Sequence, residues 1–284
     1  MGLLGSRLLC TFALVAAITA PAVSQQSEDQ RIFSEIKGLN WKLGPSTGKV
    51  AGRASLAIPA SHGFLAATAT SKFLTLMKNL PQTDSYTIAP NDLSWFAVFS
   101  FDDTGYVKDD EKIDADAVLQ ALKDNNARGN EERRRRGFPT LSIEGWFVAP
   151  HYDVETKRLE WATRLRSEFG DVSVNYKIRL LGRAGVMSAV LVSDPDSLDT
   201  DIRAFKSVLN GFSFDPGERY AEFRAGDKVA EYGLTGLIIG GAAAAAAKTG
   251  IFKILGKFAI IILAGGAAAI GGIFKWLFRP RTTT

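Results

Sequence analysis

The stretch RLEWATRLR at Arg158–Arg166 and the stretch VSVNYKIRLL at Val172–Leu181 decide the fold of this 284-residue chain. Apolar and polar residues alternate one by one in both, which is typical of β-strands with one buried face. In the first stretch, the residues on one side are Leu159, Trp161, Thr163 and Leu165. The sequence therefore predicts two neighbouring strands of an antiparallel sheet.

Further elements extend outward from these two strands. Strands are predicted at 141–149, 186–192 and 93–101, with shorter ones at 39–43, 49–53 and 55–59. Helices are predicted at 27–37, 71–80 and 114–136, the last capped by Asp114, and in a segment that begins after Ser197 and ends before Gly211. This order predicts an α+β fold: an antiparallel sheet with helices on one face and the other face open.

Residues 229–278 are apolar enough to enter a bilayer. Tyr232–Ala247 and Phe258–Phe274 carry no charge, and each approaches the ~20 residues that a spanning helix needs. We expect a C-terminal transmembrane anchor of two helices, at about 230–250 and 257–278, followed by a basic tail at 279–284. The spacing Gly236-x-x-x-Gly240 would let another helix approach the first closely. A single span is one alternative, and a buried Ala-rich helix of the soluble part is another.

Residues 1–24 are predicted to be a secretory signal peptide. Arg7 precedes an apolar core at 8–18, and small residues stand near Ser24. Because Cys10 lies in this segment, the mature chain has no thiol, which excludes disulfides and cysteine-based catalysis or metal binding. Residues 25–228 then form one extracytoplasmic domain, and we expect the protein in the bacterial inner membrane with this domain in the periplasm.

Two short motifs are weighed as catalytic sites. His151-Tyr152-Asp153 could supply a general base with its orienting partner or two metal ligands, or it could be a turn in which Tyr152 packs. Gly44-Pro-Ser-Thr-Gly48 matches a nucleophile elbow in letters, but a strand predicted after it favours a hairpin turn. His62 is the only other histidine, so no multi-histidine metal site is expected, and we predict no cofactor.

Basic residues are the only patch for which the sequence favours binding. The candidates are Arg133, Arg134, Arg135 and Arg136 together with Arg158, Arg164, Arg166, Lys177 and Arg179 on one face of the sheet. Such a face could attract an anionic envelope polymer, lipid head groups or another membrane protein. The alternative is an ordinary solvated face. A net charge of +4 is too small to indicate a nucleic-acid binder.

The chain resembles an uncharacterised bacterial family of membrane-anchored proteins, domain of unknown function 2167. The stretches that carry the resemblance are Gly105–Asp110, Asn130–Gly137, Gly145-Trp146 with Pro150–Asp153, Asn175-Tyr176 with Leu181–Arg183, and Gly226–Leu234. Phe147-Val148-Ala149 departs from the expected acidic and proline-rich residues. The resemblance implies an envelope protein but no activity. The order of helices and strands is also similar to that of PsbP-like domains, by analogy of fold alone.

Together these features predict a membrane-anchored envelope protein with a binding or scaffolding role. The alternative is a hydrolase-like or metal-assisted enzyme centred on His151 and Asp153. The sequence leaves the ligand, the protein partner and the oligomeric state open.

Overall fold

The computed structural model describes residues 30–77, 82–135 and 139–240. The predicted signal peptide and most of the predicted anchor lie outside these residues.

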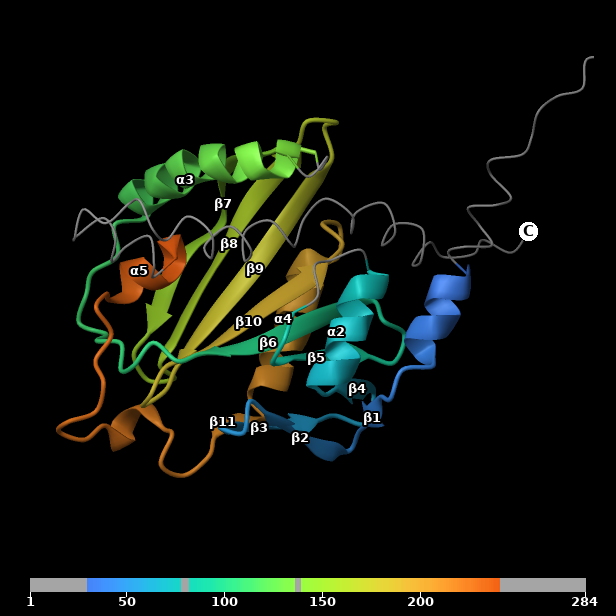
Figure 1. The fold of residues 1–284 in the computed structure, drawn as a ribbon, viewed down its shortest axis with the longest axis horizontal. Coiled ribbons are helices and arrows are strands. Elements are labelled where there is room, and N and C mark those ends of the chain that lie inside the picture. Colours follow the sequence, from blue (N-terminus) through green and yellow to red (C-terminus); the bar gives the residue numbers. More distant parts are fainter. Residues whose placement is uncertain (1–29, 78–81, 136–138, 241–284) are drawn as a thin grey trace, which may run out of the picture.

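An eight-stranded antiparallel sheet forms the centre of the molecule (Figure 1). Its strands in spatial order are β1 (Lys42–Leu43), β4 (His62–Leu65), β5 (Ser85–Pro90), β6 (Trp95–Asp102), β10 (Val186–Ser193), β9 (Val172–Leu181), β8 (Arg158–Ser167) and β7 (Leu141–Asp153). β9 has the predicted bounds, and β8 differs by one residue. The predicted α+β class with an antiparallel sheet is confirmed.

A second sheet and several helices pack against this one. The second sheet has three strands, β11 (Phe212–Phe214), β3 (Ala54–Ile58) and β2 (Ser46–Val50). The helices are α2 (Ala67–Leu76), α3 (Ala115–Arg135), α4 (Leu198–Leu209), the 3₁₀ turn η1 (Tyr220–Glu222) and α5 (Leu234–Ile239), and residues 30–37 are also helical.

Helix α3 begins where the sequence predicts it. The carboxylate of Asp114 accepts the backbone N–H groups of Asp116 (3.1 Å) and Ala117 (3.0 Å), so this residue caps the helix. Gly129 does not interrupt α3, because the helix continues to Arg135.

Helices cover both faces of the large sheet, which corrects the prediction that they lie on one face. On β6, the ring of Phe96 packs edge-to-face on Phe73 of α2 at 5.0 Å. Its neighbour Trp95, which points to the other face, packs on Phe205 of α4 at 5.9 Å. Figure 1 accordingly shows α2 in front of the strands and α4 behind them.

The strand register decides which side chains share a face. One cross-strand row consists of Val98, Val190, Lys177 and Trp161, and the next row, on the opposite face, consists of Phe99, Ala189, Ile178 and Glu160. Since Trp161 packs in a cluster with residues of α3 and α5, the first row lies on the side of those helices. The second row lies on the side of α4, where Lys206 forms an ion pair with Glu160 at 2.7 Å.

Neighbouring strands β8 and β9 therefore bury opposite faces. Leu159 and Trp161 of β8 point to the cluster formed with α3 and α5. Tyr176 and Ile178 of β9 point to the larger cluster that contains Phe205 of α4. The alternation predicted within each strand is correct, but the two strands serve two different cores.

The start of the first predicted membrane helix belongs to the folded domain. In α5, Leu234, Leu237 and Ile238 are only 1%, 7% and 5% exposed, and they pack with Val118 and Trp161. Gly240 ends the helix with a φ of 96°. The domain thus runs beyond the predicted boundary at residue 228, and Gly236 packs on Tyr232 within it.

Within the described parts of the chain, no helix is both long and apolar enough to cross a membrane. The predicted second helix, 257–278, lies outside these parts.

Candidate functional site: a basic pocket beside helix α4

The His151-Tyr152-Asp153 motif lies at the end of edge strand β7. His151 is exposed and pairs with Glu160 of β8. The carboxylate of Asp153 accepts the backbone N–H groups of Glu155 (2.9 Å) and Thr156 (3.3 Å), which closes the turn into β8. Hydrogen bonds from the side chain and backbone of Thr156 lower the pKa of Asp153, which disfavours a role as a proton acceptor. The arrangement matches the turn alternative.

Tyr152 is the member of this motif with a structural role. Its hydroxyl donates to the carboxylate of Asp109 at 2.7 Å, and Lys157 donates to the same oxygen at 2.8 Å. Burial raises the pKa of Asp109, but the hydrogen bonds from Lys157, Tyr152 and Tyr220 outweigh it, so the net pKa lies below the usual value. This contact joins two of the segments that carry the family resemblance, Gly105–Asp110 and Pro150–Asp153.

The other two candidates also have structural explanations. Ser46, in the Gly44–Gly48 motif, starts strand β2, and its hydroxyl donates to the carbonyl of Leu43 at 2.7 Å. A strand and not a helix follows Gly44-Pro45, so the geometry of a nucleophile elbow is absent. The segment is not a hairpin turn either, because β1 pairs with β4 in the large sheet and β2 pairs with β3 in the second sheet. His62 lies in β4, and the centroid of its ring is 5.5 Å from that of Trp95. Burial lowers the pKa of His62 by more than the negative charge of Asp92 raises it. Among the described residues, no group of three or more His, Cys, Asp or Glu could hold a metal ion.

The predicted basic residues of α3 do not form one patch. Arg133 is 4% exposed, and its Nε donates to the carbonyl of Pro139. Arg134 and Arg135 are exposed at the end of the helix. Arg136 lies outside the described residues.

The basic residues of the sheet lie on two faces, which corrects the prediction that they share one. Arg158, Arg164 and Arg166 point to the side of α4, whereas Lys177 and Arg179 point to the side of α3 and α5. Arg166 pairs with Glu144, and Arg164 lies over the ring of Phe147 at 5.6 Å.

On the other face, Arg179 lies over the ring of Trp161 at 5.3 Å. Burial, together with the charge of Arg179, lowers the pKa of Lys177 to about 8. The basic side chains that the structure describes therefore do not form a single surface across the sheet.

Arg158 instead lines a pocket of about 430 Å³ on the side of α4, which we call the basic pocket. It lies between the ends of β8 and β9, the C-terminal end of α4, strand β11 and η1. Its lining residues are Thr156, Lys157, Arg158, Leu180, Leu181, Leu209, Asn210, Phe212, Ser213, Phe214, Arg219, Tyr220 and Ala221. Three of these residues are cationic and none is acidic.

Aromatic rings form much of the apolar wall of this pocket. Phe212 and Phe214 pack edge-to-face with ring centroids 5.2 Å apart. A Cβ at Gly182 would lie 2.8 Å from the ring of Phe214, so only glycine lets this ring lie against the end of β9. Tyr220 is held by its hydroxyl, which donates to the carbonyl of Val107 at 2.9 Å.

Arg158 lies opposite Asp153 of β7, and its charge helps to lower the pKa of that carboxylate. The Nε of Arg158 is buried and has no hydrogen-bond partner, and within the described chain Arg158 forms no ion pair. A buried donor left unpaired costs about 1–3 kcal/mol, so this arrangement needs an explanation. An anion that enters the pocket would supply the missing acceptor.

Lys157 and Arg219 surround Arg158 with further positive charge. Lys157 has a φ of 55°, a left-handed conformation that favours glycine, and its ammonium lies 5.0 Å from the Tyr220 ring centroid. Its charge is balanced by Asp109. The nearby carboxylate of Glu222 accepts the backbone N–H groups of Gly217 and Arg219 at 2.8 and 2.9 Å. Within the described residues neither Arg158 nor Arg219 forms an ion pair, although their charges help to lower the pKa of Asp153 and of Glu222 respectively.

Sequence reasoning identified Arg158 but not the rest of this pocket. Lys157 is a turn residue, and Phe212, Phe214 and Arg219 follow helix α4 some 50 residues later. No local pattern links these segments. Long-range contacts bring them together, among them the bridge between Gly182 and Arg219 and the pairing of β11 with β3.

The same segments fall within a match to a known protein family. The model of the family described as "Protein of unknown function (DUF2167)" matches residues 42–271. This range includes every strand described above and helices α2 to α5. The chain belongs to this family. The DUF2167 match covers the basic pocket as well as the Asp109–Tyr152 contact, and it brings no activity with it.

Comparisons beyond the DUF2167 family add little. No curated protein matches the chain. The solution structure of cyanobacterial PsbP (CyanoP) from Synechocystis sp. PCC 6803 is similar with a TM-score of 0.34 and 13% identity, covering 57% of this chain and 86% of that one. This likeness is too weak to transfer a fold or a function.

Proposed function

We propose that this DUF2167 protein is an envelope protein of the bacterial inner membrane that binds a small anionic ligand on its periplasmic side. The signal-peptide pattern at 1–24 and the uncharged run at 258–274 support this location.

The packing of α5 supports a single membrane span at 257–278, the alternative to a two-helix hairpin. A helix at 230–250 could enter the bilayer only if Leu234, Leu237 and Ile238 left the core in which they are buried. The six-alanine run at 242–247 adds little hydrophobic transfer energy of its own.

Reporter fusions distinguish these two topologies. A single span places alkaline phosphatase fused after Lys253 in the periplasm, where it is active, and one fused after Thr284 in the cytoplasm, where it is inactive. A hairpin gives the reverse pattern. Activity at both positions would contradict either topology.

The ligand proposal depends on one observation: the buried Nε of Arg158 has no partner in a pocket that contains three cations and no acid. Arginine forms short, charge-assisted hydrogen bonds to phosphate and carboxylate oxygens. The rings of Phe212, Phe214 and Tyr220 line the same space. We therefore infer a ligand that joins an anionic group to an apolar one.

Phenyl phosphate is a simple probe with both features. We expect calorimetry on the mature full-length protein, held in phosphatidylcholine nanodiscs, to show saturable binding at low salt. Binding should weaken several-fold as ionic strength rises from about 0.05 to 0.5 M, because added salt screens the pocket charges. Benzyl alcohol, which has the ring but no charge, serves as control. The proposal would be contradicted if phenyl phosphate did not bind at low salt, or if benzyl alcohol bound with the same affinity.

The enzyme alternative has no comparable support. His151 is exposed on an edge strand and the carboxylate of Asp153 is engaged by its own turn. A base of this kind would need a substrate-binding pocket around it, and the two residues line neither the basic pocket nor the pocket beside β1.

A further inference from the structure

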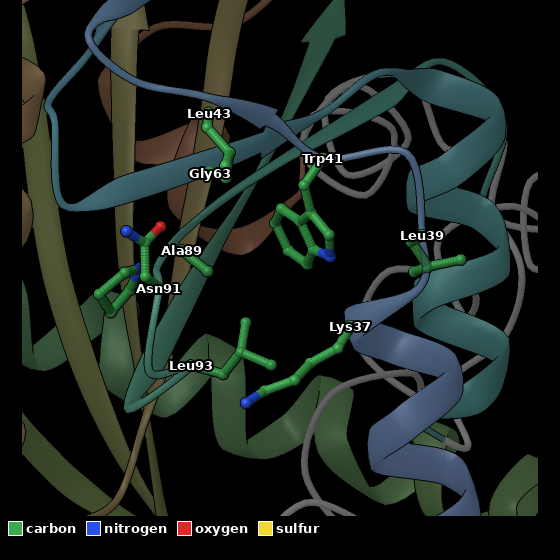
Figure 2. Close-up of a pocket in the computed structure, with 9 residues that line it drawn as sticks. Lys37, Leu39, Trp41, Leu43, Gly63, Ala89, Asn91 and Leu93 are labelled. Atoms are coloured by element: carbon green, nitrogen blue, oxygen red, sulfur yellow. The ribbon is translucent and has the colours of Figure 1, made fainter.

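A second pocket, of about 410 Å³, lies at the opposite end of the large sheet, beside edge strand β1 (Figure 2). We call it the N-terminal pocket, because the segment from Lys37 to Leu43 forms one of its walls. The other wall comes from the ends of β4 and β5 and from Leu93. It shares no lining residue with the basic pocket.

The indole of Trp41 is held rigidly in the first wall. Its Nε1 donates to the carbonyl of Ile36 at 2.8 Å, and its ring meets the ring of Phe73 edge-on at 5.9 Å. A Cβ at position 63 would lie 2.9 Å from this ring, so Gly63 allows the ring to lie against β4. An aromatic wall fixed in this way loses little conformational entropy when a ligand packs on it.

Leu93 contributes apolar surface from the opposite wall, although its backbone adopts an unfavourable conformation. Its φ of 58° lies in the left-handed region, where residues other than glycine and asparagine are disfavoured. A leucine in this conformation keeps an apolar side chain facing the pocket, where Figure 2 shows it.

Lys37 supplies a positive charge at the same pocket. Its ammonium lies 4.5 Å from the centroid of the Phe33 ring, and it has no carboxylate partner within the described chain. Figure 2 shows this side chain reaching towards Leu93. The charged end of a ligand would therefore meet Lys37 while its apolar part lay against Trp41 and Leu93.

We propose that the N-terminal pocket binds a small amphiphilic anion, with a flat or chain-like apolar group between Trp41 and Leu93 and its negative charge at Lys37. The proposal is separate from the ligand of the basic pocket, and either can hold without the other.

Naphthalene sulfonate is the probe, and fluorotryptophan incorporated into the full-length protein in phosphatidylcholine nanodiscs is the reporter. The ¹⁹F resonance of Trp41, identified by its loss in Trp41→Phe, should shift with saturation as the probe is added, and the resonance of buried Trp161 should not. Shifts of all resonances in proportion to probe concentration would mean partition into the bilayer and would overturn the proposal.

Two variants separate the two halves of the site. Lys37→Gln should weaken sulfonate binding about fivefold, as expected for a partly solvated charge pair, and leave the binding of uncharged naphthol unchanged. Leu93→Gly relieves the left-handed backbone, so it should fold, and it should weaken both probes about tenfold by removing apolar contact. Lys72→Gln, a change at an exposed lysine of α2, is the matched control. Unchanged affinity in both pocket variants would exclude this site.

Discussion

A fragment that ends at residue 233 is expected to be much less stable than one that ends at residue 240. The seven additional residues contain Leu234, Leu237 and Ile238, all at most 7% exposed and packed against α3 and β8. Burying an aliphatic side chain contributes about 1.5–3 kcal/mol, so losing three costs roughly 4.5–9 kcal/mol as an upper estimate. Since a whole domain is stable by only about 5–15 kcal/mol, the shorter fragment should be largely unfolded at 37 °C.

Urea unfolding of fragments 25–240 and 25–233, followed by circular dichroism, measures this difference. In the full-length protein, Leu237→Ala should also destabilise the domain, by about 2–3 kcal/mol. Thr235→Ala, on the half-buried side of the same helix, should change stability by less than about 0.5 kcal/mol. Equal stability of the two fragments would mean that α5 adds no stability to the domain. The original prediction, in which residues 230–240 belong to the membrane anchor, would then stand.

Replacing Arg158 by methionine should abolish most anion binding without harming the fold. A hydrogen bond to a charged group contributes about 1.5–3 kcal/mol, so phenyl phosphate should bind roughly 10–100-fold more weakly. Methionine is an unbranched, flexible side chain without a hydrogen-bond donor, so the variant would no longer bury an unpaired donor at this position. The free energy of unfolding should therefore stay the same or rise by about 1–3 kcal/mol.

These opposite effects distinguish a ligand-binding arginine from a structural one. Arg203→Met removes an exposed arginine of α4, whose guanidinium only reaches Thr200, and should leave phenyl phosphate affinity unchanged. Arg158→Met with wild-type affinity would exclude the basic pocket as the binding site. A loss of stability in that variant would instead indicate that Arg158 supports the fold.

The alternation of residues predicts strands well and sheet faces poorly in this protein. Every predicted strand of the meander from Leu141 to Ser193 is present, because period-two burial is a local property of each segment. Which side of β9 lies beside which side of β8 depends on register, and a shift of one residue reverses it. Arg158 pairs with Leu180, so Lys177 and Arg179 share a face with Trp161 and not with Arg158.

A similar limit applies to the apolar segments. The sequence shows that α5 must avoid water, but a bilayer and a protein core satisfy that need equally. Only contacts with α3 and β8 reveal that its first turns lie in a core.

The sequence by itself determined the α+β class, the central antiparallel strands, the cap of α3 and the turn at Asp153, all of which depend on neighbouring residues. Tertiary structure alone decided the two cores on opposite faces of the sheet, the burial of α5 in the second of these cores, and the meeting of Arg158 with Lys157 and Arg219. The physical reason is that local periodicity states how much apolar surface each segment must bury, whereas register and long-range packing choose the partner that buries it.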